Sequence, residues 1–244
     1  MSAAVAGLVV ALPEECRSLT DKRVRRGECF ALGEARLVCI AGIGGDNARH
    51  AARRLIDDGA SGLLSWGCAA ALSPSLKPGD LCLPEEILDA RGERRTVSPV
   101  WHERARKALE PDFDPRIGLL LTTDRIAATA TDKHALAAQF RAVAVDMESA
   151  AVAAVARERD VPFLAVRAIA DPVDMALPAA VLRATDAHGT VHPSLLLRHT
   201  LLHPGQALGL LRLASHFRAA LRTLTGAARR MGGDCLLGRT VQRR

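Results

Sequence analysis

The sequence contains no tyrosine, and aromatic residues make up only 3% of its 244 residues. Because aromatic rings supply large and geometrically specific contacts, sites that work by stacking should be few, and ligand contacts should be mostly aliphatic. Hydrophobic residues still reach 49%, so the chain can bury a sizeable core of alanine, valine, leucine and isoleucine. The length favours one α/β domain over two.

Closely spaced cysteine pairs are also missing. The six cysteines are scattered without a CxxC motif, and those inside apolar runs should behave as small buried hydrophobes. This pattern predicts reduced thiols and a cytoplasmic location. The first apolar run has no basic segment before it and is too short to span a bilayer, so we interpret residues 5–12 as a strand.

Several familiar motifs are absent. Gly42, Gly44 and Gly45 are too close together for the GxGxxG pattern of dinucleotide-binding folds, and neither a Walker loop nor a GxSxG nucleophile elbow occurs. Two histidine pairs lack the adjacent acid of an HExxH zinc motif, and we expect no metal site. These pairs are His188 with His192 and His199 with His203.

The formal net charge of +6 is unevenly distributed. Residues 226–244 hold five arginines and one aspartate, a balance of +4, which leaves only +2 for the remainder. No nucleic-acid recognition motif accompanies this segment, so we expect no nucleic-acid partner. We predict one domain at residues 1–225 and a basic, disordered tail at residues 226–244. Contact of the tail with phosphates or anionic lipid stays open.

Short apolar runs alternate with helical stretches, which predicts an α/β fold with helices packed on a mixed sheet. A loop or lid is predicted at residues 172–193, because proline and glycine punctuate it. The predicted strands are residues 5–12, 35–41, 62–66, 80–84, 116–121, 143–147 and 163–169. The predicted helices are residues 47–58, 99–110, 132–140, 149–159, 194–202 and 204–224.

Acidic residues follow one predicted strand in "AVDMES", residues 144–149. Asp146 and Glu148 would lie where an α/β sheet ends, which is the usual place for a ligand. A carboxylate accepts two hydrogen bonds, so Glu148 suits the vicinal hydroxyls of a ribose. The alternative is an acidic residue that only favours a helix N-terminus.

A second charged strand end occurs in "VPFLAVRAIAD", residues 161–171. An arginine inside a buried strand needs a carboxylate partner, and we expect Glu148 to pair with Arg167. Asp171 has no arginine beside it in the sequence, and Pro172 keeps it out of regular helix. A partly desolvated aspartate holds its proton more tightly, as a general acid must.

Three further turns could approach the same cleft. Glu14 and Glu15 follow the first strand in "LPEECR", where one could face a ligand or both could simply begin a helix. In "AGIGGDNARHAA" the amide of Gly44 could cradle an anion or a ribose edge. In "SWGCAAAL" the small residues let the backbone at Cys68 and Ala69 approach a ligand closely.

Together with "LKPGDL", these motifs resemble the nucleoside phosphorylase and nucleosidase superfamily, which includes methylthioadenosine/S-adenosylhomocysteine nucleosidases. The ordered set spans residues 5–174. Within the superfamily, "RAIADPVDMALP" and "LLLRHTLLHPGQALGLLRLASHFRAALRTL" are most similar to hopanoid-associated phosphorylases, also called adenosylhopane nucleosidases, and extend the likeness to about residue 224. The resemblance implies a three-layer α/β/α sandwich and cleavage of the bond between ribose C1′ and a purine.

The resemblance also assigns roles. Asp171 aligns with the acid that protonates purine N7, Glu148 with the acid that binds the ribose hydroxyls, and Glu15 with the acid that activates water. Met147 would pack on the sugar, and Arg167 would steady the region. The site prediction also includes Asp146, Gly44, Cys68 and Ala69 for substrate, and Gly44 with Arg49 for phosphate. Because the transition state resembles an oxocarbenium ion, carboxylates suit its charge, and neither a metal nor an organic cofactor is implied.

Two departures from the family pattern bear on the mechanism. Residues 68–71 read CAAA where nucleosidases commonly read SAGG, and Ala170 replaces the serine that usually precedes the catalytic aspartate. That serine hydroxyl could have oriented Asp171. Glu15 favours water as the nucleophile, whereas Arg49 beside the glycine turn leaves phosphate open as a co-substrate.

We therefore expect an enzyme that releases adenine from adenosylhopane and leaves ribosylhopane or its phosphoribosyl form. Leucine-rich helices from residue 195 onward could line a groove for the apolar hopane tail or approach a membrane. A methylthioadenosine/S-adenosylhomocysteine nucleosidase, a general purine nucleoside phosphorylase and a non-catalytic nucleoside-binding regulator stay open. The resemblance also implies a homo-oligomer.

Overall fold

The computed structural model describes residues 4–179, 181, 207–233, 235 and 237. Within this part of the chain, ten strands form one mixed sheet in the order β2-β3-β1-β4-β9-β8-β6-β7, and β10 pairs with β4 and β5. The strands are β1 (Ala6–Val10), β2 (Cys29–Ala31), β3 (Arg36–Ile40), β4 (Gly62–Ala71), β5 (Leu81–Cys82), β6 (Glu86–Asp89), β7 (Arg94–Thr96), β8 (Leu119–Thr122), β9 (Ala144–Asp146) and β10 (Phe163–Asp171).

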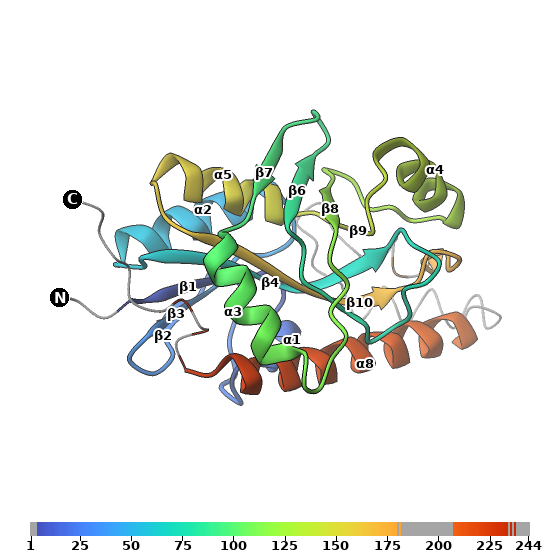
Figure 1. The fold of residues 1–244 in the computed structure, drawn as a ribbon. Coiled ribbons are helices and arrows are strands. Elements are labelled where there is room, and N and C mark those ends of the chain that lie inside the picture. Colours follow the sequence, from blue (N-terminus) through green and yellow to red (C-terminus); the bar gives the residue numbers. More distant parts are fainter. Residues whose placement is uncertain (1–3, 180, 182–206, 234, 236, 238–244) are drawn as a thin grey trace.

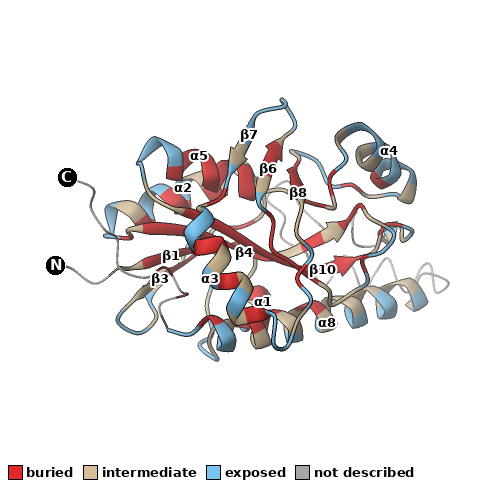
Figure 2. Ribbon diagram, in the orientation of Figure 1, coloured by how far each residue is buried: buried red, intermediate tan, exposed pale blue. Residues whose placement is uncertain are grey.

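Helices cover both faces of the sheet (Figure 1). Helices α2 (Gly45–Asp57) and α5 (Ser149–Glu158) pack on each other and on one face, while α1 (Pro13–Cys16), α3 (Pro99–Leu109) and α8 (Ala207–Met231) pack on the other. Buried residues concentrate in the sheet and on the helix faces turned toward it (Figure 2). The predicted α/β fold with a central mixed sheet is therefore confirmed. Among the described helices, none is long and apolar enough to cross a membrane.

Local sequence signals explain where the remaining helices begin. Helix α4 (Ala130–Phe140) starts after Thr129, whose hydroxyl and backbone amide exchange hydrogen bonds with Asp132 in a capping box. Helix α3 starts with a proline after Ser98, whose hydroxyl accepts a hydrogen bond from the Trp101 amide. Both caps satisfy backbone groups that would otherwise lack partners.

The sequence analysis missed strands β2, β6 and β7 and ended β4 too early. Each of these strands has only three or four residues, too few to form an apolar run of strand length, so only pairing with neighbours defines them. Strand β4 was predicted to end at residue 66 but continues to Ala71. Its second half is rich in glycine and alanine, which form strands poorly, but Ala70 lies opposite Asp171 of β10 and Val145 of β9. Tertiary pairing on both sides therefore overrides local propensity.

The predicted domain boundary at residue 225 falls inside helix α8. Helix α8 continues to Met231, and Ala227 and Met231 are fully buried. The carbonyl of Cys235 accepts a hydrogen bond of 2.7 Å from the Trp101 indole, and the Leu237 side chain is buried too. The apolar residues of this segment therefore pack inward while its arginines at 229 and 230 stay exposed.

Some predictions lie outside the described residues. These are the helix at residues 194–202, the two histidine pairs, and most of the loop at residues 172–193. The predicted helix at residues 204–224 is described only from Ala207 onward.

The prediction that all cysteines are reduced is wrong for Cys29 and Cys39, which are joined by a disulfide. They are direct cross-strand partners in the antiparallel pair of β2 and β3, with their Cα atoms 4.1 Å apart. They are ten positions apart in sequence with a turn between them, so no spacing motif signals the pair. Cys16, Cys68 and Cys82 remain thiols. The cytoplasmic location, which was inferred from reduced cysteines, stays a prediction.

Candidate active site

The predicted site residues come together because β4 extends past its neighbour. Strand β1 pairs with β4 only as far as Val10 opposite Trp66. Beyond that point the second half of β4 lies between β9, which runs antiparallel to it, and β10, which runs parallel. The chain segments after β1 and β9 and the end of β10 thus meet beside one stretch of β4. A cavity of about 240 Å³ lies there, and its lining includes Glu15, Cys68, Ala69, Asp146, Met147, Glu148 and Asp171.

Glu15 is held by backbone amides on one side of this cavity. Its Oε1 accepts a hydrogen bond of 2.7 Å from the Cys68 amide, and its Oε2 accepts one of 3.0 Å from the Leu12 amide. A Cβ atom at Gly67 would lie 2.7 Å from Oε1, so only glycine lets the carboxylate approach β4 this closely. Burial raises the pKa of Glu15, and the Cys68 amide and the nearby Arg167 oppose that rise.

Glu148 reaches across to the glycine turn. Its Oε1 accepts a hydrogen bond of 2.8 Å from the Gly44 amide, and its Oε2 accepts one of 3.3 Å from the Met147 amide. Burial, followed by the charge of Asp146, raises the pKa of Glu148 to about 7, while Arg167 and the Gly44 amide oppose the rise. The carboxylate is therefore buried and fixed, and it can change protonation state near neutral pH.

The predicted partner of Arg167 is wrong, because the guanidinium pairs with Asp146 rather than with Glu148. Its Nε and Nη2 lie 2.9 and 2.8 Å from Asp146 Oδ2, and Nη2 also donates to the hydroxyls of Ser65 and Ser149. The Thr122 hydroxyl donates to Asp146 Oδ1 at 2.7 Å. Arg167 is buried and links Asp146 of β9 to Ser65 and Ser149 through this network, and the steadying role that the resemblance implies stays a prediction.

Asp171 has a partner that the sequence analysis did not find. The Nζ atom of Lys133, on α4, lies 2.6 Å from Asp171 Oδ2, and the Lys133 side chain is completely buried. Burial raises the pKa of Asp171, and the charge of Lys133, with a smaller contribution from His216, opposes that rise. The signal in the sequence was weak: a lysine four residues into a helix, where the helix dipole disfavours a cation.

Apart from Thr123 and Arg125, the rest of the cavity wall is apolar. Leu213 and Phe217 come from α8, Leu177 comes from the segment after β10, and Ile126 precedes α4. Leu208 and Leu211, farther toward the start of α8, are largely exposed, as is Ile126 in part. By helical periodicity, Leu208 and Leu211 lie on a different face of α8 from the cavity-lining Leu213 and Phe217.

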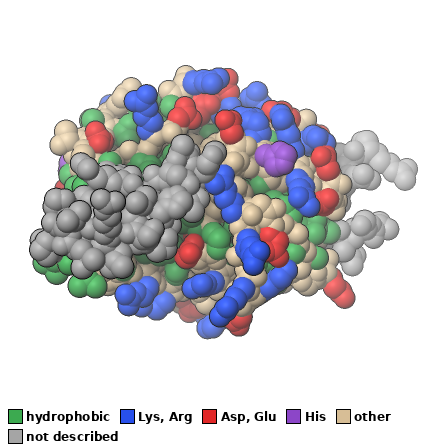
Figure 3. Space-filling view, turned by 180° about the vertical axis from the view of Figure 1, so that it is seen from behind, with side chains coloured by type: hydrophobic (Ala, Val, Ile, Leu, Met, Phe, Trp, Pro, Cys, Tyr) green, Lys and Arg blue, Asp and Glu red, His purple; other side chains and the backbone are tan. Residues whose placement is uncertain are grey.

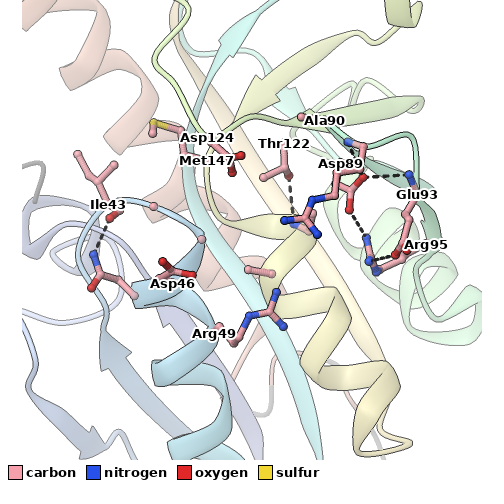
Figure 4. A pocket seen from close by; sticks show the side chains of 16 residues that line it. Ile43, Asp46, Arg49, Asp89, Ala90, Glu93, Arg95, Thr122, Asp124 and Met147 are labelled. Carbon is pink, nitrogen blue, oxygen red and sulfur yellow. Dashed lines mark hydrogen bonds and ion pairs between the residues drawn. The ribbon is translucent and has the colours of Figure 1, made fainter. Parts of the chain in front are cut away.

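Gly44 and Arg49 lie in a neighbouring groove rather than in this cavity. The groove has a volume of about 620 Å³, and Ile43 and Met147 line both spaces. Figure 4 shows Arg49, Asp46 and Arg95 around it, with Arg95 bonded to Asp89 and Glu93. The Gly44 amide donates a hydrogen bond to Glu148, and Arg49 pairs with Glu158 at 3.5 Å. The two residues predicted for phosphate thus already have acidic partners.

Two further predictions concern metal ions and nucleic acid. Among the described residues, no group of three or more His, Cys, Asp and Glu side chains could hold a metal ion. On the face shown in Figure 3, the described lysine and arginine side chains are interspersed with acidic ones rather than gathered into one basic patch. The absence of a nucleic-acid partner stays a prediction.

Three solved structures illustrate the fold that this chain shares with known proteins. The 5′-methylthioadenosine/S-adenosylhomocysteine nucleosidase of Helicobacter pylori is 18% identical, with a TM-score of 0.71 over 95% of this chain and 98% of that one. Futalosine hydrolase of the same organism is 18% identical, with a TM-score of 0.70 over 93% and 97%. The 5′-methylthioadenosine/S-adenosylhomocysteine nucleosidase of Neisseria meningitidis is 20% identical, with a TM-score of 0.68 over 92% and 97%.

Sequence comparison adds the family. No curated protein matches the chain. The family model for the phosphorylase superfamily matches residues 5–197, a range that contains the three strand-end acids of the cavity. The chain therefore belongs to the phosphorylase superfamily.

Proposed function

We propose that this protein cleaves the N-glycosidic bond of a purine nucleoside at the cavity beside β4. The observation that carries the proposal is that Glu15, Glu148 and Asp171, from three different strand ends, line one small cavity. Cleavage leaves positive charge on the ribose and negative charge on the departing base. Carboxylates near the sugar stabilise its positive charge, and a proton donor near the base neutralises its negative charge.

Asp171 is the proposed general acid. Burial raises the pKa of its carboxyl, so the group holds a proton at higher pH than an exposed aspartate does. Transfer of this proton to purine N7 neutralises the base as the bond to C1′ breaks. General-acid catalysis of this kind contributes roughly 10² to 10⁴ in rate.

Glu148 is the proposed ligand of the ribose hydroxyls. Its carboxylate is fixed by the amides of Gly44 and Met147, and it keeps lone pairs that can accept the 2′ and 3′ hydroxyls. Met147 lines the same cavity and would pack on the sugar. A fixed carboxylate next to the ribose also favours the positive charge that develops there.

Water is the proposed nucleophile, activated by Glu15. The Glu15 carboxylate faces the cavity and is fixed by two backbone amides. The two residues predicted for phosphate do not line this cavity, and the Gly44 amide already donates to Glu148. The geometry thus favours hydrolysis over phosphorolysis, and an assay with and without phosphate tests this choice.

The proposed substrate carries an apolar group on its 5′ side, and adenosylhopane is our specific candidate. Leu177, Leu213 and Phe217 form an apolar part of the cavity wall. Such a wall suits a hydrocarbon substituent better than the amino acid portion of S-adenosylhomocysteine. A homo-oligomer, a cytoplasmic location and peripheral membrane contact remain predictions that accompany this assignment.

The experiment is to supply adenosylhopane, methylthioadenosine and S-adenosylhomocysteine separately and to quantify free adenine. We expect adenine from adenosylhopane with the highest kcat/KM and no dependence on phosphate. Turnover of the small nucleosides alone would reject the apolar substrate while retaining the nucleosidase. Binding of these nucleosides without release of base, by a correctly folded protein, would instead support a non-catalytic regulator.

A further inference from the structure

A completely buried lysine lies beside the candidate active site. Lys133 has 0% of its surface exposed, and it is the fourth residue of α4. Lysine is almost never fully buried unless its charge is paired, and a cation near the start of a helix also opposes the helix dipole. A specific set of contacts must therefore offset both costs.

All three hydrogens of the Lys133 ammonium have acceptors. Nζ lies 2.6 Å from Asp171 Oδ2, and it donates to the carbonyls of Pro172 at 3.0 Å and Met175 at 2.7 Å. An ammonium group has three donors and no acceptor, so these contacts use all of them. Lys133 thereby fixes the aspartate to the two carbonyls that follow it in the chain.

The other oxygen of the same carboxyl has no partner among the described residues. This atom, Asp171 Oδ1, is buried, and Asp171 lines the cavity. A buried polar atom without a partner is rare and calls for a specific explanation. A hydrogen bond to a base in the cavity would supply the missing partner.

We propose that Lys133 is a positioning residue that holds Asp171 Oδ2 so that Oδ1 presents its proton to the leaving base. This role rests on the proposed function. When the proton moves from Oδ1 to the purine nitrogen, Asp171 becomes a carboxylate. Lys133 then lies in contact with the new negative charge and stabilises it without any rearrangement. It also fulfils the orienting role for which Ala170 leaves no hydroxyl.

Replacing Lys133 with methionine keeps most of the side-chain volume and removes the charge. We expect kcat to fall about 100-fold, as for a misplaced catalytic group, with little change in KM. Lys107→Met, on the exposed side of α3, is the matched control and should leave kcat unchanged. Equal kcat in Lys133→Met and the wild type would overturn the proposal.

The pH profile separates positioning from a purely structural effect. The groups whose charges act on Asp171 are Lys133 from α4 and His216 from α8, and both lower its pKa against the effect of burial. Without Lys133 the pKa of Asp171 rises further. Activity that requires protonated Asp171 should then decline at higher pH in Lys133→Met than in the wild type. A loss of activity with an unshifted profile would contradict the proposal.

A double-mutant cycle asks whether Lys133 acts through Asp171. In the Asp171→Asn background, Lys133→Met should cost no further kcat, because the group that it positions is already gone. Multiplying losses would show an independent structural role and overturn the proposal.

The deciding test does not depend on turnover. The carboxyl 13C resonance of Asp171, assigned by its absence in Asp171→Asn, is titrated in wild-type protein and in Lys133→Met. We expect a higher pKa in the variant, and an unchanged pKa in the folded variant would overturn the role of Lys133. A shifted pKa in a protein that releases no base from any nucleoside would instead overturn the proposed function alone. If circular dichroism shows that Lys133→Met does not fold, Lys133→Gln carries the same test.

Discussion

Two buried ion pairs at the ends of strands make an instructive comparison. In the pair of Arg167 and Asp146, both carboxylate oxygens are occupied: Oδ2 by the guanidinium, and Oδ1 by the Thr122 hydroxyl. In the pair of Lys133 and Asp171, Oδ2 is occupied but Oδ1 has no partner among the described residues. A fully satisfied network rigidifies a fold, whereas an oxygen left free beside a cavity is available to a ligand.

The comparison distinguishes a pair that stabilises the fold from a pair that acts in the proposed reaction. Asp146 and Arg167 link β9 to β10. Asp171 and Lys133 meet at the end of β10, where Asp171 lines the cavity and its Oδ1 is buried without a partner among the described residues. Loss of the first pair should therefore act on stability, and loss of the second should act on kcat.

The largest expected effect comes from Asp171→Asn, which keeps the shape of the side chain but removes the acid. We expect kcat to fall by roughly 10² to 10⁴, because general-acid catalysis is lost, while binding of nucleoside changes little. Adenine release under single-turnover conditions is the measurement. Asp174→Asn, on an exposed side chain three residues away, is the control. Wild-type kcat in Asp171→Asn would place the acid elsewhere.

Breaking the other pair should act on folding. Arg167→Met leaves Asp146 buried without its cation, and such changes cost about 3 to 5 kcal/mol of unfolding free energy. Urea denaturation followed by circular dichroism measures the change. Arg94→Met removes one member of the exposed pair with Glu86 and should cost no more than about 1 kcal/mol. Similar stabilities for the two variants would contradict the scaffold role of Arg167.

A smaller effect should appear in the pH dependence of stability. The pKa of Glu148 is raised to about 7 from its ordinary value of 4.5, first by burial and then by Asp146. A raised carboxyl pKa stabilises the folded protein below the ordinary value, and this contribution is lost as pH rises through about 7. Glu148→Gln removes the titration, so its Tm relative to wild type should increase between about pH 5 and pH 8.

The control for this titration is Glu14→Gln, an exposed glutamate beside Glu15. Its Tm difference from wild type should stay constant over the same range. A constant Tm difference for Glu148→Gln as well would mean that Glu148 does not titrate in this pH range. Its carboxyl would then be ionised over the whole range.

The smallest effect concerns the apolar wall. Leu213→Gln places an amide in the cavity lining, and we expect kcat/KM to fall about tenfold for a nucleoside with a long apolar 5′ group, the scale of one lost apolar contact. Methylthioadenosine should lose less. Leu211→Gln, on the same helix but largely exposed, should leave the ratio of the two substrates unchanged. Equal losses for both substrates in Leu213→Gln would remove the support for an apolar tail.

The sequence was sufficient to predict the α/β class and the acids at strand ends, because buried strands and the charges that end them have strong local patterns. It could not reveal the partners of those acids. Asp146 and Glu148 are two residues apart, and only the direction of β9 decides which one meets Arg167. Lys133 is 38 residues before Asp171 on a helix with no strong apolar face, so nothing local marks it as buried.

The extension of β4 and the end of α8 were missed for a related reason. The alanines after Gly67 form a strand only because β9 and β10 pair with them. The arginines near residue 230 made the segment read as an exposed tail, although Met231 is buried. In both places long-range packing decides a structure that local composition disfavours.

The central claim is tested most directly by the structure of a complex with a non-hydrolysable adenine nucleoside analogue. The account predicts that Asp171 Oδ1 lies within hydrogen-bond distance of purine N7, that Lys133 still contacts Oδ2, and that Glu148 binds the ribose hydroxyls. An analogue bound with its base away from Asp171, or with its ribose away from Glu148, would contradict the account.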